Sequence, residues 1–188
     1  MVDGGSTDAT AALAAPDCDK LISSARGRAR QMNAGAAAAT GEIIFFLHAD
    51  TLIPFDLENA LSGIKGGYAW GCFSVSLSGA HPLLRLIGFF INLRSRWTGI
   101  ISGDQTMFVR GTLFNQAGGF PDIPLMEDIA LSRSLKKLSA PVCLKQQVIT
   151  SSRRWEKHGI LRTVLKMWSL RFRYALGADP AILAGKYE

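Results

Sequence analysis

A short apolar run that ends abruptly in a histidine and an aspartate constrains the fold of this chain most. Residues 43–47 read Ile-Ile-Phe-Phe-Leu and lead straight into His48, Ala49 and Asp50. An aromatic and β-branched run of this length predicts a strand that is buried on both faces, and we expect it to pair in parallel. Ligands of open α/β sheets bind beyond the carboxyl ends of the strands, where His48 and Asp50 lie.

His48 and Asp50 suit chemistry assisted by a metal ion. They are two residues apart, so in an extended segment their side chains point the same way. An imidazole nitrogen and a carboxylate oxygen can together hold a divalent cation and, through it, a phosphate. The alternative is an ordinary strand end in which Asp50 and Thr51 cap the next turn. The motif alone leaves both interpretations open.

Length, charge and cysteine content bound the class of protein. The 188 residues predict one domain over 1–188, and the net charge of +6 favours anionic partners such as nucleotide phosphates or anionic lipid. The three cysteines form no C-x-x-C pair, so we expect a reduced, cytoplasmic setting. We expect no nucleic-acid partner, because the charge comes with no recognised motif and no interleaved aromatic residues.

Helical and strand patterns alternate along the chain. Helices are predicted over residues 8–15, 26–40, 54–65, 82–97, 124–138 and 159–176, and strands over 20–23, 68–77, 106–109, 142–144 and 148–151. This alternation predicts an α/β fold with a mostly parallel sheet flanked by helices. The short, closely spaced strands of the second half also allow an antiparallel element there.

Basic residues mark three of these helices. Arg26, Arg28 and Arg30 open the second helix, where cations oppose the helix dipole. Either an anionic ligand lies nearby or this is a solvated basic face. The helices over 82–97 and 159–176 are amphipathic with basic edges. They either lie weakly on an anionic membrane surface at the inner face of the membrane, as a peripheral association, or pack on the core.

Four separated motifs resemble those of family 2 glycosyltransferases, which have the GT-A fold. They occur in the family's order and are Val2-Asp3-Gly4-Gly5-Ser6-Thr7-Asp8, His48-Ala49-Asp50, Glu127-Asp128 and Arg153-Arg154-Trp155. In the family the corresponding strings are Asp-Asp-Gly-Ser-Thr-Asp, Asp-X-Asp, Glu-Asp and Gln-X-X-Arg-Trp. Fuller strings, such as Leu-His-Ala-Asp-Thr and Pro-Leu-Met-Glu-Asp-Ile, are similar to one bacterial subgroup associated with selenium-domain or arsenosugar gene neighbourhoods.

The resemblance implies a hexosyltransferase-type enzyme that moves a sugar from a nucleotide-diphosphate donor to an acceptor hydroxyl and inverts the anomeric configuration. It implies that Asp128 is the general base and that Asp50 holds Mn²⁺ or Mg²⁺. His48 replaces the family's first aspartate and contacts the ribose or the metal. Its imidazole suits Mn²⁺ better than Mg²⁺.

The resemblance also implies the residues that bind the substrates. Asp3 would bind the base or ribose of the donor, Arg154 would steady the leaving diphosphate, and Trp155 would stack under the acceptor. Asp104, Gln105 and Glu127 complete the expected substrate-binding set. Simpler roles compete with these, because an acidic pair suits the first turn of any helix and adjacent arginines are often a solvated patch.

The beginning of the chain departs from the family. Family members begin with a strand and loop that lie in the middle of the sheet, whereas this sequence opens two residues before the Asp-Gly-Gly turn. We therefore expect that the first βα unit is missing. The competing hypothesis is an inactive fragment, or a peripheral membrane-binding module that uses its basic amphipathic helices.

Overall fold

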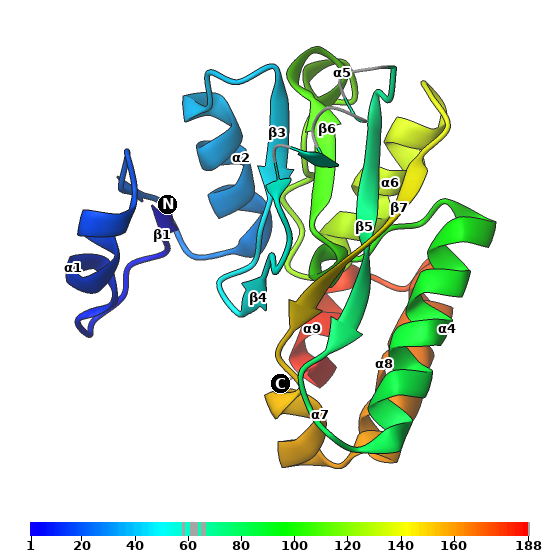
Figure 1. Ribbon diagram of the computed structural model, residues 1–188. Helices are drawn as coiled ribbons and strands as arrows, with labels where there is room; N and C mark the ends of the chain where they lie inside the picture. The colour runs from blue at the N-terminus through cyan, green and yellow to red at the C-terminus, as the bar shows by residue number, and fades with distance from the viewer. Residues whose placement is uncertain (58, 61–63, 65–66, 188) are drawn as a thin grey trace.

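The computed structural model describes residues 1–57, 59–60, 64 and 67–187, and its strands form two sheets (Figure 1). A two-stranded parallel sheet pairs β1 (Val2–Asp3) with β2 (Ile22–Ser23). The second sheet has the order β3-β6-β5-β7-β4. Its strands are β3 Ile43–Phe46, β4 Thr51–Leu52, β5 Trp70–Leu77, β6 Met107–Arg110 and β7 Val142–Thr150.

The five-stranded sheet is mixed, so the expectation of a mostly parallel sheet was wrong. The β3–β6, β5–β6 and β4–β7 pairs are antiparallel, and β5–β7 is parallel. The parallel pairing expected for β3 was therefore also wrong. An apolar run indicates a strand covered on both faces and carries no information about the direction of its neighbour. The two strands predicted over 142–151 are one strand, β7, with a register irregularity opposite Cys72 and Ser74.

The segment with His48 and Asp50 connects the two edge strands of this sheet, β3 and β4. β6 pairs with the first residues of β5, Trp70–Cys72, whereas β4 pairs with the last residues of β7. β3 and β4 consequently lie at opposite edges although only residues 47–50 separate them. The turn at residues 47–50 therefore connects one edge of the sheet to the other.

Eight α-helices are described. They are α1 Thr10–Ala14, α2 Arg28–Ala38, α4 Pro82–Thr98, α5 Gly111–Gln116, α6 Glu127–Lys136, α7 Arg153–His158, α8 Ile160–Ala175 and α9 Pro180–Tyr187, and two 3₁₀ turns are η1 Ala15–Asp17 and η2 Gly103–Gln105. Five of the six predicted helices are present; four have slightly shorter bounds than predicted, and α4 extends one residue further. The sixth, over 54–65, includes residues 58, 61–63 and 65, which lie outside the described residues. α5, α7 and α9 were not predicted.

Alternate residues of the central strands build a core on each face of the sheet. On β5, Trp70 and Cys72 belong to one buried cluster, whereas Phe73 and Val75 belong to the other. This period of two is the one expected of a strand. α6 contributes to the first cluster and α4 contributes Ile91 to the second. A third cluster joins α6, α8 and α9.

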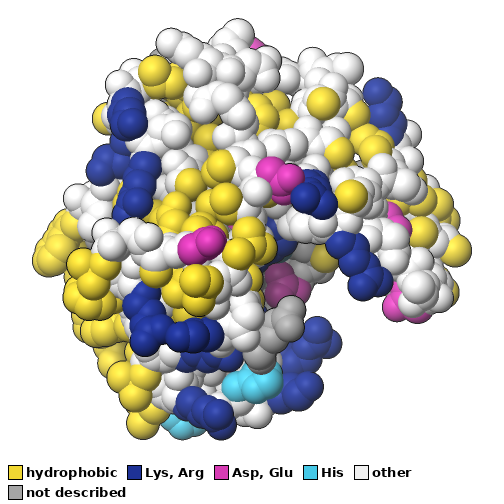
Figure 2. All heavy atoms as spheres, turned by 180° about the vertical axis from the view of Figure 1, so that it is seen from behind, with side chains coloured by type: hydrophobic (Ala, Val, Ile, Leu, Met, Phe, Trp, Pro, Cys, Tyr) yellow, Lys and Arg dark blue, Asp and Glu magenta, His cyan; other side chains and the backbone are white. Residues whose placement is uncertain are grey.

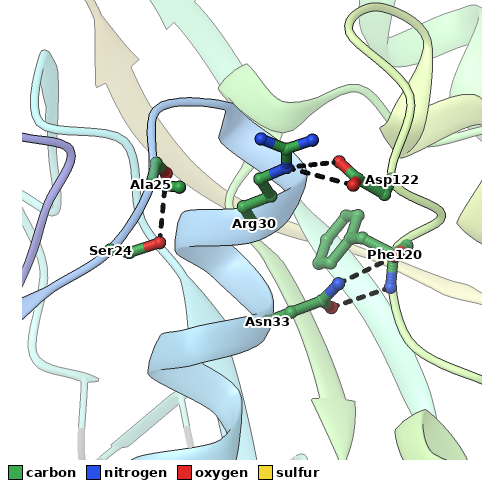
Figure 3. A network of polar contacts seen from close by, with 6 residues as sticks. All are labelled: Ser24, Ala25, Arg30, Asn33, Phe120 and Asp122. Atoms are coloured by element: carbon green, nitrogen blue, oxygen red, sulfur yellow. Dashed lines mark hydrogen bonds and ion pairs between the residues drawn. The ribbon is translucent and has the colours of Figure 1, made fainter.

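Polar contacts fix α2 against the loop before α6 (Figure 3). The Asn33 side chain donates to the Phe120 carbonyl (2.8 Å) and accepts from the Phe120 amide (3.0 Å). Arg30 Nε donates to both carboxylate oxygens of Asp122 at 2.8 and 3.0 Å. Arg28 at the start of α2 also pairs with Glu127 at 3.0 Å, so the first turn of α2 lies beside the first turn of α6, which carries two of the predicted site residues.

Candidate functional site

A cavity of about 810 Å³ opens beside the turn that follows β3, and α4, α7 and α8 contribute to its wall. Its volume is within the range of small-ligand sites. Six of the predicted site residues line it, namely His48, Asp50, Asp104, Asp128, Arg154 and Trp155. Segments that are distant in the sequence thus meet in one pocket, to which these six residues bring three carboxylates, an imidazole and a guanidinium.

Backbone hydrogen bonds hold His48 and Asp50 at the pocket. The Thr51 amide donates to the His48 carbonyl (3.1 Å), and the Ser151 amide donates to the Asp50 carbonyl (3.0 Å). The His48 ring lies against Gly103, where a Cβ atom would come within 2.4 Å of the ring carbon Cε1. A glycine at position 103 therefore makes room for the imidazole, while the exposed Asp50 carboxylate remains accessible to a ligand.

Two backbone amides orient the Asp128 carboxylate at the start of α6. Oδ2 accepts from the Gly103 amide (3.0 Å), and Oδ1 accepts from the Ile129 amide (2.7 Å). Each carboxylate oxygen has two lone pairs, so these contacts leave acceptor capacity free. Gly103 thus contacts both the imidazole of His48 and the carboxylate of Asp128, and it links the strand-end turn to α6.

Glu127 points away from the cavity into the protein. Its side chain is 3% exposed, and Oε1 pairs with Arg28 Nε at 3.0 Å. The other oxygen, Oε2, is buried without a hydrogen-bond partner in the part of the chain that the structure describes. Burial raises the pKa of Glu127, while the Arg28 charge opposes the increase. Glu127 therefore does not line the cavity, but it positions Arg28, which does.

The structure does not bring Asp3 or Gln105 to the cavity. The Asp3 carboxylate accepts hydrogen bonds from the Ser6 hydroxyl and from the Ser6 and Gly5 amides, and these bonds, the hydroxyl's above all, lower its pKa. Gln105 is 1% exposed. Its Oε1 accepts from Ser95 Oγ at 2.6 Å inside the protein. Gln105 thus stabilises the turn that presents Asp104.

The C-terminal helix supplies a pocket residue that sequence reasoning missed. Tyr187 of α9 lines the cavity, and its ring centroid lies 3.7 Å from the Arg154 guanidinium carbon. Arg154 also donates to the Tyr187 carbonyl (2.8 Å), and Arg28 lies 5.8 Å from the same ring. Tyr187 belongs to no motif, so its place in the pocket follows only from the packing of α9.

The missed arginines of the cavity are Arg28, Arg94 and Arg171. The sequence offered a signal for each, because cations opened the helix at Arg28 and basic edges accompanied the helices that carry Arg94 and Arg171. It could not show that these side chains turn toward the pocket. Of the alternatives for the arginine-rich helix start, Arg28 faces the site, whereas Arg30 pairs with Asp122 on the surface.

The donor atoms at the strand end fit a divalent cation that arrives with a diphosphate. No group of three or more His, Cys, Asp or Glu side chains that could hold a metal occurs among the described residues. Mg²⁺ in nucleotide-dependent enzymes is held by one or two carboxylates together with substrate phosphates and water. Asp50 and His48 carry donor atoms that suit this protein share.

Known proteins resemble this chain both in sequence and in fold. Residues 1–109 match the family described as Glycosyl transferase family 2. The mannosyltransferase PcManGT from Pyrobaculum calidifontis, solved in complex with GDP-Man and Mn²⁺, is 25% identical, with a TM-score of 0.54 over 79% of this chain and 46% of its own. No curated protein matches the chain.

S. aureus TarS (residues 1–349) is 17% identical, with a TM-score of 0.61 over 99% of this chain and 59% of that one. At this identity the likeness to TarS concerns the fold alone. The chain therefore spans about half the length of the solved structures that it matches. The α/β fold agrees with that of GT-A glycosyltransferases, although its sheet is mixed.

Proposed function

Because this chain belongs to glycosyl transferase family 2, we propose that it moves a sugar from a nucleotide-diphosphate donor to an acceptor hydroxyl. The observation that carries the proposal is the single cavity in which His48, Asp50 and Asp128 meet. Direct sugar transfer needs a cation at the diphosphate and a general base, and this set offers two donors that suit a cation and a carboxylate that backbone amides orient.

In the proposed mechanism Asp128 accepts the proton of the acceptor hydroxyl as its oxygen attacks the anomeric carbon. The bond from that carbon to the diphosphate breaks, and the electron pair leaves with the nucleoside diphosphate. Because attack and departure occur on opposite faces of the sugar, the anomeric configuration inverts. Arg28 and Arg154 place positive charge in the pocket, which favours a negatively charged leaving group. When bound at Asp50 and His48, a divalent cation would offset charge on the diphosphate.

The test is donor turnover with and without metal. We expect the purified chain to release nucleoside diphosphate from at least one nucleotide sugar when Mn²⁺ is present, and to lose that activity in EDTA. GDP-mannose is the first donor to assay, because the 25% identical mannosyltransferase was solved with GDP-Man and Mn²⁺. UDP-glucose and UDP-N-acetylglucosamine complete a small panel, and coupled detection of the released diphosphate is the measurement.

Two results separate the proposal from its competitor, an inactive fragment. Restoration of activity when Mn²⁺ is added back after EDTA would support the enzyme. If the folded protein neither binds nor turns over any donor of the panel with Mn²⁺ or Mg²⁺, the proposal is contradicted for this chain. In that case a binding module that uses the basic helices becomes the better explanation.

A second proposal concerns peripheral contact with a membrane. Seen from behind, hydrophobic side chains gather on the left of the molecule over α4 and α8, with Lys and Arg side chains among them (Figure 2). The most exposed apolar side chains of these helices include Trp97 (80%), Leu165 (68%) and Phe172 (67%). The expectation that both apolar stripes pack on the core is therefore incomplete. Among the described helices, none is long and apolar enough to cross a bilayer.

We expect this face to give weak, salt-sensitive association with anionic vesicles. Each basic residue near such a surface contributes about 1 kcal/mol, and Arg162, Lys166 and Arg173 stand on α8 without an intervening acid. Flotation with phosphatidylglycerol-containing liposomes at low salt measures it, with phosphatidylcholine liposomes as the control. Protein that stays at the bottom of the gradient with both liposomes would show that the exposed face serves another purpose.

A further inference from the structure

Two arginines of the cavity lack the anionic partner that the structure gives to Arg28. Arg94 on α4 and Arg171 on α8 both line the cavity. The Nε atom of each is buried without a hydrogen-bond partner among the described residues, and neither forms an ion pair within that part of the chain. Arg94 donates from Nη2 to the neutral Ser102 Oγ (3.0 Å). A buried Nε atom without a partner is costly unless a ligand completes its hydrogen bonding.

The two guanidinium groups also repel each other. Burial, as the largest cause, and the charge of Arg171, as the second, lower the pKa of Arg94 to about 10. The charges of Asp104 and Asp128 act in the opposite direction. Arg94 is still charged at neutral pH, so two like charges share a partly desolvated site. An anion between them would relieve both the repulsion and the unsatisfied Nε atoms. Guanidinium pairs suit phosphate because their planar donors match its oxygens.

The same helix faces are otherwise apolar. Side chains one or two turns before each arginine line the cavity, and we call them the apolar groove: Ile87, Phe90 and Ile91 on α4, and Val164, Met167 and Trp168 on α8. Residues three or four apart lie on one face of a helix, so each arginine continues the apolar face of its own helix. A free diphosphate or a sugar would leave this groove unused, whereas a hydrocarbon chain would fill it.

We propose that Arg94 and Arg171 bind the phosphate of an amphiphilic acceptor whose hydrocarbon chain lies in the apolar groove. This inference rests on the proposed function and names its acceptor class, a lipid that carries a phosphate and a hydroxyl next to it. The transfer step is unchanged. The hydroxyl oxygen bonds to the anomeric carbon, its proton goes to Asp128, and the electron pair leaves with the nucleoside diphosphate. The lipid phosphate is bound and is not altered.

The first test is a binding titration that needs no turnover. Decyl phosphate below its critical micelle concentration is titrated into the protein, and tryptophan fluorescence reports binding, because Trp97 and Trp168 line the cavity. We expect decyl phosphate to bind at least about tenfold more tightly than decanol, inorganic phosphate or hexyl phosphate, since both the charge and the added methylenes contribute. Equal affinity for decanol would overturn the anion site, and equal affinity for inorganic phosphate would overturn the lipid chain.

Variants then test whether the two arginines bind the acceptor and not the donor. We expect Arg94→Gln and Arg171→Gln to weaken decyl phosphate binding about tenfold or more and to leave GDP binding with Mn²⁺ unchanged. Arg133→Gln is the matched control, because the exposed Arg133 stands on α6 outside the cavity lining. Arg94→Lys keeps the charge and serves if the glutamine variant misfolds. The inference would be overturned if both arginine variants bound decyl phosphate with wild-type affinity. It would also be overturned if they lost GDP binding and kept decyl phosphate binding.

These measurements also distinguish this inference from the proposed function. If decyl phosphate binds as expected but no nucleotide sugar is turned over, the amphiphile site stands and the transferase proposal fails. If turnover is found while the arginine variants bind decyl phosphate normally, the transferase proposal stands and the acceptor class is wrong.

Discussion

Replacement of Asp128 by asparagine is expected to reduce sugar transfer by about 10²- to 10⁴-fold while leaving donor affinity close to wild type. Loss of a positioned general base has an effect of this size. Asparagine keeps the shape and one carbonyl oxygen, so the amide of Ile129 or of Gly103 can still find an acceptor, but the side chain can no longer take a proton. Initial rates with GDP-mannose or the active donor of the panel, together with calorimetric donor affinity, give the measurement.

Asp122→Asn is the matched control for that change. It makes the same replacement of a carboxylate by an amide. Asp122 lies in the loop before α6, pairs with Arg30 on the surface and is outside the cavity lining. An exposed ion pair of this kind contributes little to stability, so the control should retain near-normal turnover. Near-normal turnover in Asp128→Asn would assign the proton transfer to another carboxylate, and Asp104 is the next candidate in the cavity.

Local patterns predicted the elements well and the assembly of the sheet poorly. The strand at residues 43–46 and the alternation over β5 were predicted because burial on two faces and a period of two are visible in a short window. The antiparallel pairing of β3 with β6 joins residues about 65 positions apart, and no local pattern contains the direction of such a partner. The short helices α5, α7 and α9 lack the several turns that a helical period needs to be recognised.

The residues of the candidate site were likewise predictable only where a local motif carries them. His48, Asp50 and Asp128 were recognised because strand-end and motif positions carry them, and the structure brings them into one cavity. Gln105 belongs to the same kind of short motif, yet its amide serves the interior. Arg94 and Arg171 could be recognised only as members of basic edges, because the burial of their Nε atoms depends on how α4 and α8 pack together.

The second large effect is expected at Asp50. We expect Asp50→Ala to weaken Mn²⁺-supported GDP binding by at least about 30-fold without changing the thermal midpoint of unfolding. Opposite unit charges about 4 Å apart interact by about 4 kcal/mol at an effective dielectric constant of 20, and solvent around an exposed carboxylate reduces this. Stability should be unaffected, because the carbonyl of Asp50, and not its carboxylate, accepts the hydrogen bond from Ser151.

Calorimetric titration of GDP with Mn²⁺ and in EDTA measures the contribution of the metal at Asp50. In EDTA the wild type should fall to the affinity of Asp50→Ala, because both then lack the cation that bridges protein and diphosphate. Asp19→Ala is the control, since it removes an exposed carboxylate far from the cavity lining and should bind GDP like the wild type. If Asp50→Ala retains wild-type affinity with Mn²⁺ while EDTA abolishes binding, the cation is held elsewhere. His48 and Asp104, which also line the cavity, are then the residues to replace.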